Sequence, residues 1–136
     1  MIIQCISNKI KDLPKEYLHL AAVGSRQIEG SIIIEKKYTV YAIILFENQT
    51  WYYICDETYT YYPVWNPAPF FKITNNTLSK HWCFSFNRKN NESFLGFKEW
   101  ASEPYFYDRL TDKNEREVKI FQKYKKLIDE EANTAT

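Results

Sequence analysis

The stretch that decides the fold is residues 38–55, which read YTVYAIILFENQTWYYIC. Both alternating sets of side chains in 38–46 are apolar or aromatic, which is typical of a strand covered on both faces along part of its length. Residues 47–49 are turn-formers, and 50–55 is a second aromatic-rich run. The pattern therefore predicts a β-hairpin that is buried in the core.

Further strands are expected on either side of this hairpin, because apolar and aromatic residues recur in short runs bounded by polar ones. The expected strands are 2–6, 32–34, 70–73, 81–86 and 94–97. In contrast, Pro63, Pro67 and Pro69 argue against a regular central strand in 56–69. We expect that segment to be irregular.

Two helices are expected near the ends of the chain, a short one at 13–22 and a longer one at 112–130. Asp112 is a suitable N-cap for the longer helix, and Glu115 three residues later completes a capping box. Residues 103–107 are expected to be an extended connector before it. The apolar stripe of the longer helix is Val118, Phe121, Tyr124, Leu127 and Ile128.

These elements predict one mainly β (α+β) domain covering residues 1–136. Strands of this length close most easily into a small SH3-like or related five-stranded barrel, with a C-terminal amphipathic helix packed on it. The expected parts are an N-terminal strand and short helix at 1–29, the barrel core at 30–100, the helix at 111–131 and a frayed tail at 132–136.

Composition excludes several classes of protein. Of 136 residues, 45% are hydrophobic and 26% charged, as in a globular domain and unlike a disordered chain. The net charge of +1 gives no general reason to expect nucleic acid or an anionic membrane as partner. The three glycines, 24, 30 and 96, cannot form a phosphate-binding loop, and we expect no cofactor.

No catalytic or metal-binding group stands out, so we expect no enzyme. Two histidines and three scattered cysteines do not supply the four ligands of structural zinc. The N-terminus lacks the features of a signal peptide and no apolar run reaches about 18 residues, which favours a cytoplasmic protein. Cys5, Cys55 and Cys83 are then expected to be reduced core residues. An enzyme with an undetected site is a third hypothesis, which rapid modification of Cys55 or Cys83 would favour.

An acidic, aromatic face is the first candidate site. Residues 38–71 contain three acids and no Lys or Arg, and their centre at 56–65 combines Pro63 with Tyr and Trp. Such residues are typical of anchors at protein interfaces, and acidic groups would attract a basic partner. The other interpretation is that these rings only fill the core. The candidate partner-binding residues are Glu47, Asp56, Glu57, Tyr59, Tyr61, Tyr62 and Trp65.

The stretch 72–98 supports an alternative, because its basic residues alternate with aromatic ones. That combination on a small barrel is typical of proteins that bind RNA or single strands. A solvated hairpin loop at 88–93 is a simpler explanation for part of the charge. The candidate nucleic-acid-binding residues are Lys72, Lys80, Arg88 and Lys89.

The hairpin of 38–55, with its opening K-x-Tyr-x-Val strand and Trp-Tyr-x-Ile-x-Asp return, resembles small bacterial SH3-like barrels over residues 31–87. The whole chain also resembles, by size and aromatic content, the cytoplasmic immunity proteins of bacterial toxin systems. The second resemblance implies a non-catalytic domain that binds and blocks a cognate toxin, often a basic nuclease.

Overall fold

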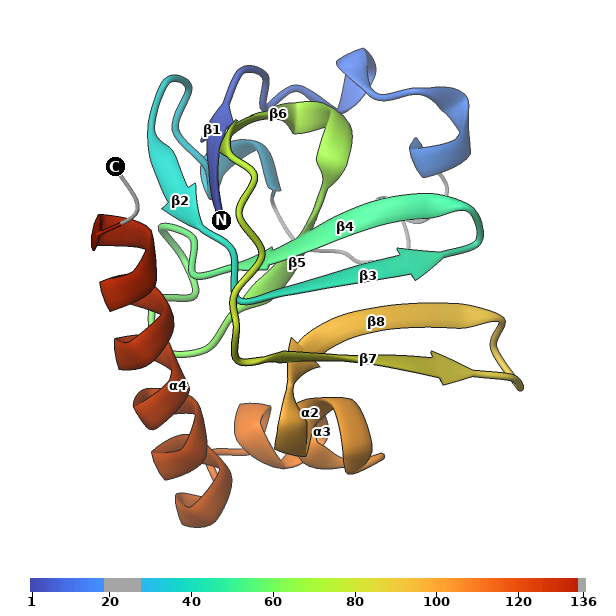
Figure 1. Cartoon of the computed structure of the whole chain (residues 1–136). Helices are drawn as coiled ribbons and strands as arrows, with labels where there is room; N and C mark the ends of the chain where they lie inside the picture. Colours follow the sequence, from blue (N-terminus) through green and yellow to red (C-terminus); the bar gives the residue numbers. More distant parts are fainter. Residues whose placement is uncertain (19–27, 135–136) are drawn as a thin grey trace.

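In the computed structural model, residues 1–18 and 28–134 are described, and they build two antiparallel sheets and a C-terminal helix (Figure 1). The smaller sheet has the order β2-β1-β6 and the larger sheet the order β5-β4-β3-β8-β7. The strands are β1 (Ile2–Cys5), β2 (Lys37–Thr39), β3 (Ala42–Phe46), β4 (Gln49–Ile54), β5 (Val64–Pro67), β6 (Phe71–Asn75), β7 (Trp82–Asn87) and β8 (Glu92–Phe97).

Helices surround the larger sheet on two sides. In Figure 1, two short helices lie below β7 and β8, and the long C-terminal helix α4 flanks the end of the sheet opposite to the hairpin tips. No described helix is long and apolar enough to cross a membrane. The helices are α2 (Lys98–Ser102), α3 (Phe106–Thr111) and α4 (Glu115–Thr134), and the 3₁₀ turns are η1 (Ile10–Asp12), η2 (Ile28–Gly30) and η3 (Ala68–Phe70).

The predicted central hairpin is confirmed as β3 and β4. Phe46 pairs with Gln49, so the turn has two residues, Glu47 and Asn48, with φ of 52° and 65°. Positive φ at both positions is the backbone of a type I′ turn, whose twist matches that of the strands. Residues 42–44 are buried in succession, as expected of a strand covered on both faces.

The predicted single strand at 38–46 is divided between the two sheets. Val40 donates its N–H to the Met1 carbonyl at 3.1 Å, whereas Tyr41 donates to the Tyr53 carbonyl at 2.9 Å. The chain therefore leaves the smaller sheet after β2 and enters the larger one at β3. Both residues are buried at the crossing. The apolar pattern of the sequence is therefore continuous there, although the strand itself is interrupted.

The α+β class and the C-terminal helix are confirmed, but the closed barrel is not. The larger sheet ends in two separate edge strands, β5 and β7, and its strands are not paired with those of the smaller sheet. Five strands are present in the larger sheet, yet the described chain forms two open sheets rather than one closed one.

Three strand predictions need correction. Residues 32–34 form a turn region with exposed Ile33 and Ile34, not a strand. Residues 64–67 form β5, an edge strand, which is where a proline can stand without breaking a ladder. The loop expected at 88–93 is shorter, because β8 begins at Glu92.

The helix predictions are partly wrong as well. The expected connector at 103–107 contains the start of α3, and α2 precedes it. Asp112 is the C-cap of α3 instead of the N-cap of the long helix, which begins at Glu115 and continues through residues expected to fray. The short helix expected at 13–22 is helical over 15–18, and its remainder lies outside the described residues.

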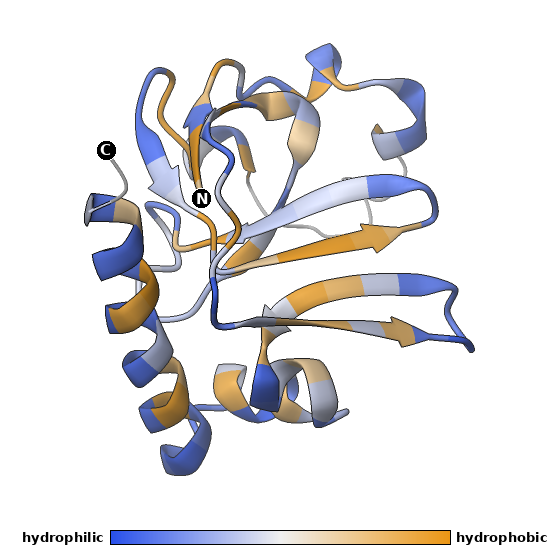
Figure 2. Ribbon diagram, in the orientation of Figure 1, coloured by the Kyte–Doolittle hydropathy of each residue, from blue (hydrophilic) through white to orange (hydrophobic). Residues whose placement is uncertain are grey.

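Two hydrophobic clusters form the core, and Tyr53, Trp82 and Phe94 pack against both. One cluster lies between the sheets and the other joins the larger sheet to the helices. The apolar stripe of α4 faces inward, where it is orange in Figure 2. Phe121 and Ile128 are each 1% exposed, so the predicted stripe is confirmed as core packing.

Candidate functional site

The most exposed large apolar side chains of the larger sheet gather on one of its faces. Phe84 is 67% exposed, Phe86 52% and Leu45 46%. Register places them together, because Phe84 pairs with Leu95 and Leu95 pairs with Ile43, two residues before Leu45 on the same face. We call Leu45, Phe84, Phe86 and Leu95 the aromatic face. Clustered apolar exposure of this kind marks interaction sites in folded proteins.

The aromatic face borders a free sheet edge. Among the described strands β7 pairs with β8 alone, whereas the opposite edge strand β5 has buried residues at 64, 66 and 67 and ends in a proline. The six residues of β7 contain no charged residue and no proline. Edge strands are usually protected by such residues, so an uncharged edge beside exposed rings indicates a place where another chain binds.

The tip of the β7–β8 hairpin is basic. Arg88 and Lys89 are exposed in the turn at 88–91, which the Asn87 side chain supports by accepting the Lys89 N–H at 3.0 Å. Asn91 closes the turn with a φ of 50°. The hairpin therefore carries two cations at the end of β7 where the aromatic face lies.

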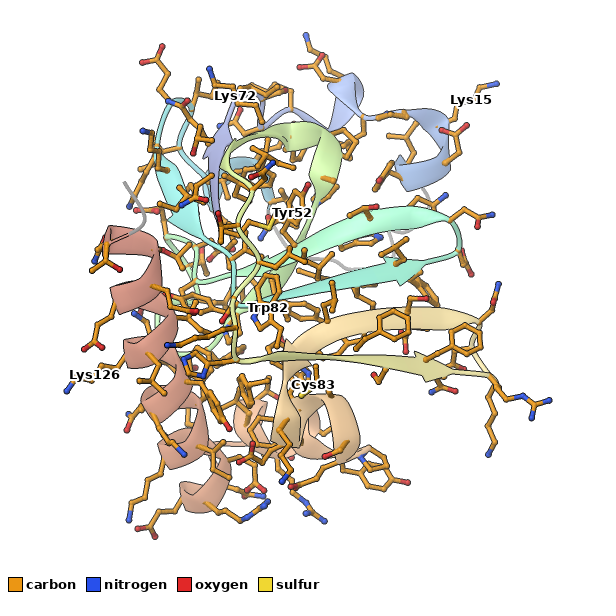
Figure 3. The ribbon with its side chains drawn as sticks, in the orientation of Figure 1. Lys15, Tyr52, Lys72, Trp82, Cys83 and Lys126 are labelled. Atoms are coloured by element: carbon orange, nitrogen blue, oxygen red, sulfur yellow. The ribbon has the colours of Figure 1, made fainter. Side chains whose placement is uncertain are left out.

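A groove opens on the other face of the same hairpin. It has a volume of about 590 Å³ and lies between β7–β8 and the helices α2 and α3. Its apolar lining includes Phe94, Trp100 and Tyr107. The hairpin contributes Ser85, Phe86 and Asn87 from β7 and the cations Arg88 and Lys89 from the turn. Trp100 and Tyr107 are stacked with ring centroids 5.4 Å apart. Figure 3 shows that consecutive residues of β7 leave on opposite sides, Trp82 toward the sheet interior and Cys83 toward α2.

Asp56 of the predicted acidic site is a structural residue. It is only 2% exposed, and its Oδ1 accepts the N–H groups of Thr58 and Tyr59 at 2.9 and 2.7 Å. A carboxylate that is buried and holds the turn after β4 has no surface to offer a partner. The placement of Asp56 in the contact surface is therefore unsupported, and its substitution would test folding rather than binding.

The other two predicted acids lie apart from each other. Glu57 forms an ion pair with Lys36 at 2.8 Å and accepts a hydrogen bond from the Tyr38 hydroxyl. The Lys36 ammonium lowers the pKa of Glu57, and the Tyr38 hydroxyl lowers it further. Glu47 stands at the β3–β4 turn, beyond the other end of β4. The structure does not bring these acids together into one face.

The predicted aromatic anchors also divide. Trp65 packs against Trp51 with ring centroids 4.5 Å apart and lies partly buried against the core cluster between the sheets. Tyr62 contacts both Tyr59 and Tyr61 in the irregular segment before β5, with ring centroids 5.5 and 4.7 Å apart. Tyr61 is half-exposed under the Lys113 ammonium. The three tyrosines form one cluster, but Trp65 is not part of it.

The basic residues of the alternative site are spread over the molecule. Lys72 is on β6 of the smaller sheet, at the top of Figure 3, and Lys80 precedes β7. Arg88 and Lys89 follow β7, roughly 20 Å of strand away from Lys80. Only Arg88 and Lys89 therefore accompany the exposed rings.

The cysteines differ in their surroundings. Cys5 is buried and Cys55 half-buried, and desolvation raises the pKa of Cys55 to about 12. Cys83 is exposed on β7, so the prediction that it fills the core is wrong. Rapid reaction of Cys83 with a thiol reagent would follow from its exposure and would not indicate a catalytic role. In the described part of the chain no three His, Cys, Asp or Glu side chains gather as metal ligands would.

Alternation along the predicted strand 81–86 puts Phe84 and Phe86 on one face, but it gives no reason to select them for a protein contact. Their exposure depends on β7 being the last strand in the sheet order, and strand order is not written in the alternation of side chains. The absence of charge in 82–87 was the one available signal. No family model, curated protein or solved structure matches this chain.

Proposed function

We propose that this chain is a non-catalytic protein-binding domain whose partner docks on the aromatic face. The observation that carries the proposal is the exposure of Phe84 and Phe86 side by side on an unprotected edge strand. Leaving two phenyl rings in water has no benefit for the isolated fold, whereas burial of such rings supplies much of the energy of protein interfaces.

The class of partner that we propose is a toxin, which this domain would block as a cytoplasmic inhibitor of the immunity type. An inhibitor of that kind covers its target and needs no catalytic groups of its own. Support comes from the small size and aromatic content of the chain. The contact surface that we propose is the aromatic face and not the predicted acidic residues. We therefore expect the partner's surface to be apolar where it covers the aromatic face and acidic where it meets Arg88 and Lys89.

Binding of single-stranded nucleic acid is the second candidate, since exposed rings next to Arg88 and Lys89 could stack on bases. Two observations favour protein. Leu45 and Leu95 add aliphatic surface that cannot stack, and Lys72 lies on β6 of the smaller sheet, away from the exposed rings. Nucleic acid would also leave the free backbone edge of β7 unused.

The test compares three forms of the full chain as bait in lysate of the cells that naturally make it. The first is wild type, and the second is Phe84→Ser with Phe86→Ser. The matched control is Ile33→Ser with Ile34→Ser, which removes two apolar side chains that are each 50% exposed in a loop. Circular dichroism checks that all three are folded.

We expect wild type and the control to retain one protein at equal stoichiometry, and the Phe84/Phe86 variant to lose at least about 100-fold in affinity for it. The difference in affinity between wild type and the Phe84/Phe86 variant should be the same after the lysate has been treated with nuclease. Equal retention by all three baits would contradict the proposal, and retention that disappears with nuclease would favour nucleic acid.

A further inference from the structure

We infer that the partner binds by strand addition: an extended, acidic segment of the partner protein pairs with the free edge of β7 and places alternate side chains on the aromatic face and in the groove behind it. The inference rests on the proposed function and names how that site is used. Three independent features of the β7–β8 hairpin lead to it.

The first feature is the backbone edge. An edge strand presents unpaired N–H and C=O groups along its length, which is the template for adding a strand. β7 is six residues long and carries no charge, proline or register shift in its pairing with β8. Along the described part of the larger sheet, only this edge combines that length with exposed side chains.

The second feature is that both faces next to this edge are open. Successive residues of an added strand point to opposite faces and lie about 4.8 Å from β7. On one face they meet Phe84 and Phe86. On the other face they meet Ser85 and the groove of about 590 Å³ that Phe94 and Trp100 line, to which Phe86 also contributes. Pockets on alternate sides are how strand addition achieves side-chain specificity.

The third feature is charge. From Lys80 to Asn91 the chain contains Lys80, Arg88 and Lys89 and no acid. Two acids line the groove, and Arg116 binds one of them, Glu103, through two hydrogen bonds of 2.8 and 2.9 Å. The other, Glu92, shares the groove lining with Arg88 and Lys89. At the hairpin tip Arg88 and Lys89 outnumber Glu92, so they select an acidic residue at that end of the bound segment. At the other end of β7 the Glu131 carboxylate, which accepts the Lys80 N–H at 3.0 Å, offsets the Lys80 charge.

The same cations argue against a second copy of this chain. Antiparallel pairing of two β7 strands centred on Phe84 would set Arg88 of each copy opposite Lys80 of the other. Like charges directly opposite are destabilising in a sheet. The occupant is therefore a segment of a different protein.

The experiment selects a phage-displayed library of random peptides about twelve residues long, enough to span β7, on the immobilised full-length chain. The best clone is then synthesised and tested against wild type, Arg88→Glu with Lys89→Glu, and the matched charge reversal Lys9→Glu with Lys11→Glu near the N-terminus. The second readout is the rate at which a thiol reagent modifies Cys83 on β7.

We expect enriched clones with alternating apolar residues and Asp or Glu at one end. The peptide should slow Cys83 modification at least about tenfold, and Arg88→Glu with Lys89→Glu should weaken binding at least about tenfold while the N-terminal reversal has little effect. The inference is overturned by no enrichment, by clones without acids, by unchanged Cys83 reactivity, or by displacement of the peptide with a single-stranded oligonucleotide.

These failures are distinguishable from failure of the proposed function. If the natural partner is still lost on Phe84→Ser with Phe86→Ser while no peptide protects Cys83, the aromatic face binds protein without strand addition. If the natural partner ignores both phenylalanines, the docking site itself is wrong.

Discussion

Asp56 stabilises the turn that follows β4, because its buried Oδ1 accepts two backbone N–H groups. Asp56 therefore contributes to the stability of this one loop. Its neighbour Glu57 forms an ion pair with Lys36. Neither acid is therefore the unpaired surface charge, ready to bind a basic partner, that the acidic stretch of sequence indicates.

The first prediction concerns this turn. Asp56→Ala should lower the free energy of unfolding by about 2 kcal/mol, because two N–H groups lose a charged acceptor. Asp56→Asn keeps an oxygen at that position and should lose less. Urea unfolding of the three forms measures both differences. An Asp56→Ala variant as stable as wild type would show that the turn does not depend on this carboxylate.

The second prediction concerns the thiols. Cys83 should react with a thiol reagent at neutral pH at least about 100-fold faster than Cys5 and Cys55, which are protected by burial. Mass spectrometry of the modified chain identifies the residue, and Cys83→Ser should abolish the fast phase. Fast labelling of Cys55 in the folded protein would contradict its burial and its raised pKa.

At the scale of elements, the β3–β4 hairpin, β7 and β8 could be predicted because each is a run of apolar and aromatic residues bounded by turn residues. β5 could not, since Pro63 and Pro67 are permitted there only by its edge position. The break at residues 40 and 41 was hidden because both residues are buried at the crossing between sheets.

A third prediction tests the packing between β8 and the groove. A Cβ on Gly96 would collide with the Phe94 ring, which packs against Trp100 at 5.2 Å. Gly96→Ala should therefore cost about 1–3 kcal/mol of stability and alter the groove. Gly30→Ala is the matched control, because nothing lies within 4 Å of the added atom. Equal stability of the two variants would refute the close approach of Phe94.

A fourth prediction concerns the ion pair that ties the turn after β4 to Lys36. A carboxylate whose pKa is lowered on folding adds stability above its ordinary pKa of 4.5, and that stability is lost as the pH falls through the lowered value. Glu57→Gln should thus be less stable than wild type at neutral pH by about 0.2–1 kcal/mol, and the difference should disappear as the pH falls through the lowered pKa of Glu57. The urea unfolding midpoints of both forms, measured from neutral to acidic pH, test this dependence. A stability difference that grows on acidification would contradict the prediction.

At the scale of the whole molecule, the α+β class and the inward face of α4 could be predicted from periodicity. The path of the chain between sheets and the order of strands depend on which surfaces meet in three dimensions. These decide that Trp65 is partly buried against the core and that Phe84 is exposed. The candidate site moved for that reason: residue type indicated interface chemistry in both stretches, and only the fold separates a buried ring from an exposed one.

The most direct test of the central claim is amide hydrogen exchange of the full chain with and without the protein that it captures. Binding at the aromatic face should slow exchange of the β7 amides, residues 82–87, at least about tenfold and leave residues 56–62 unchanged. Slowing confined to 56–62, where the acidic and tyrosine-rich segment lies, would contradict the account and return the contact to that segment.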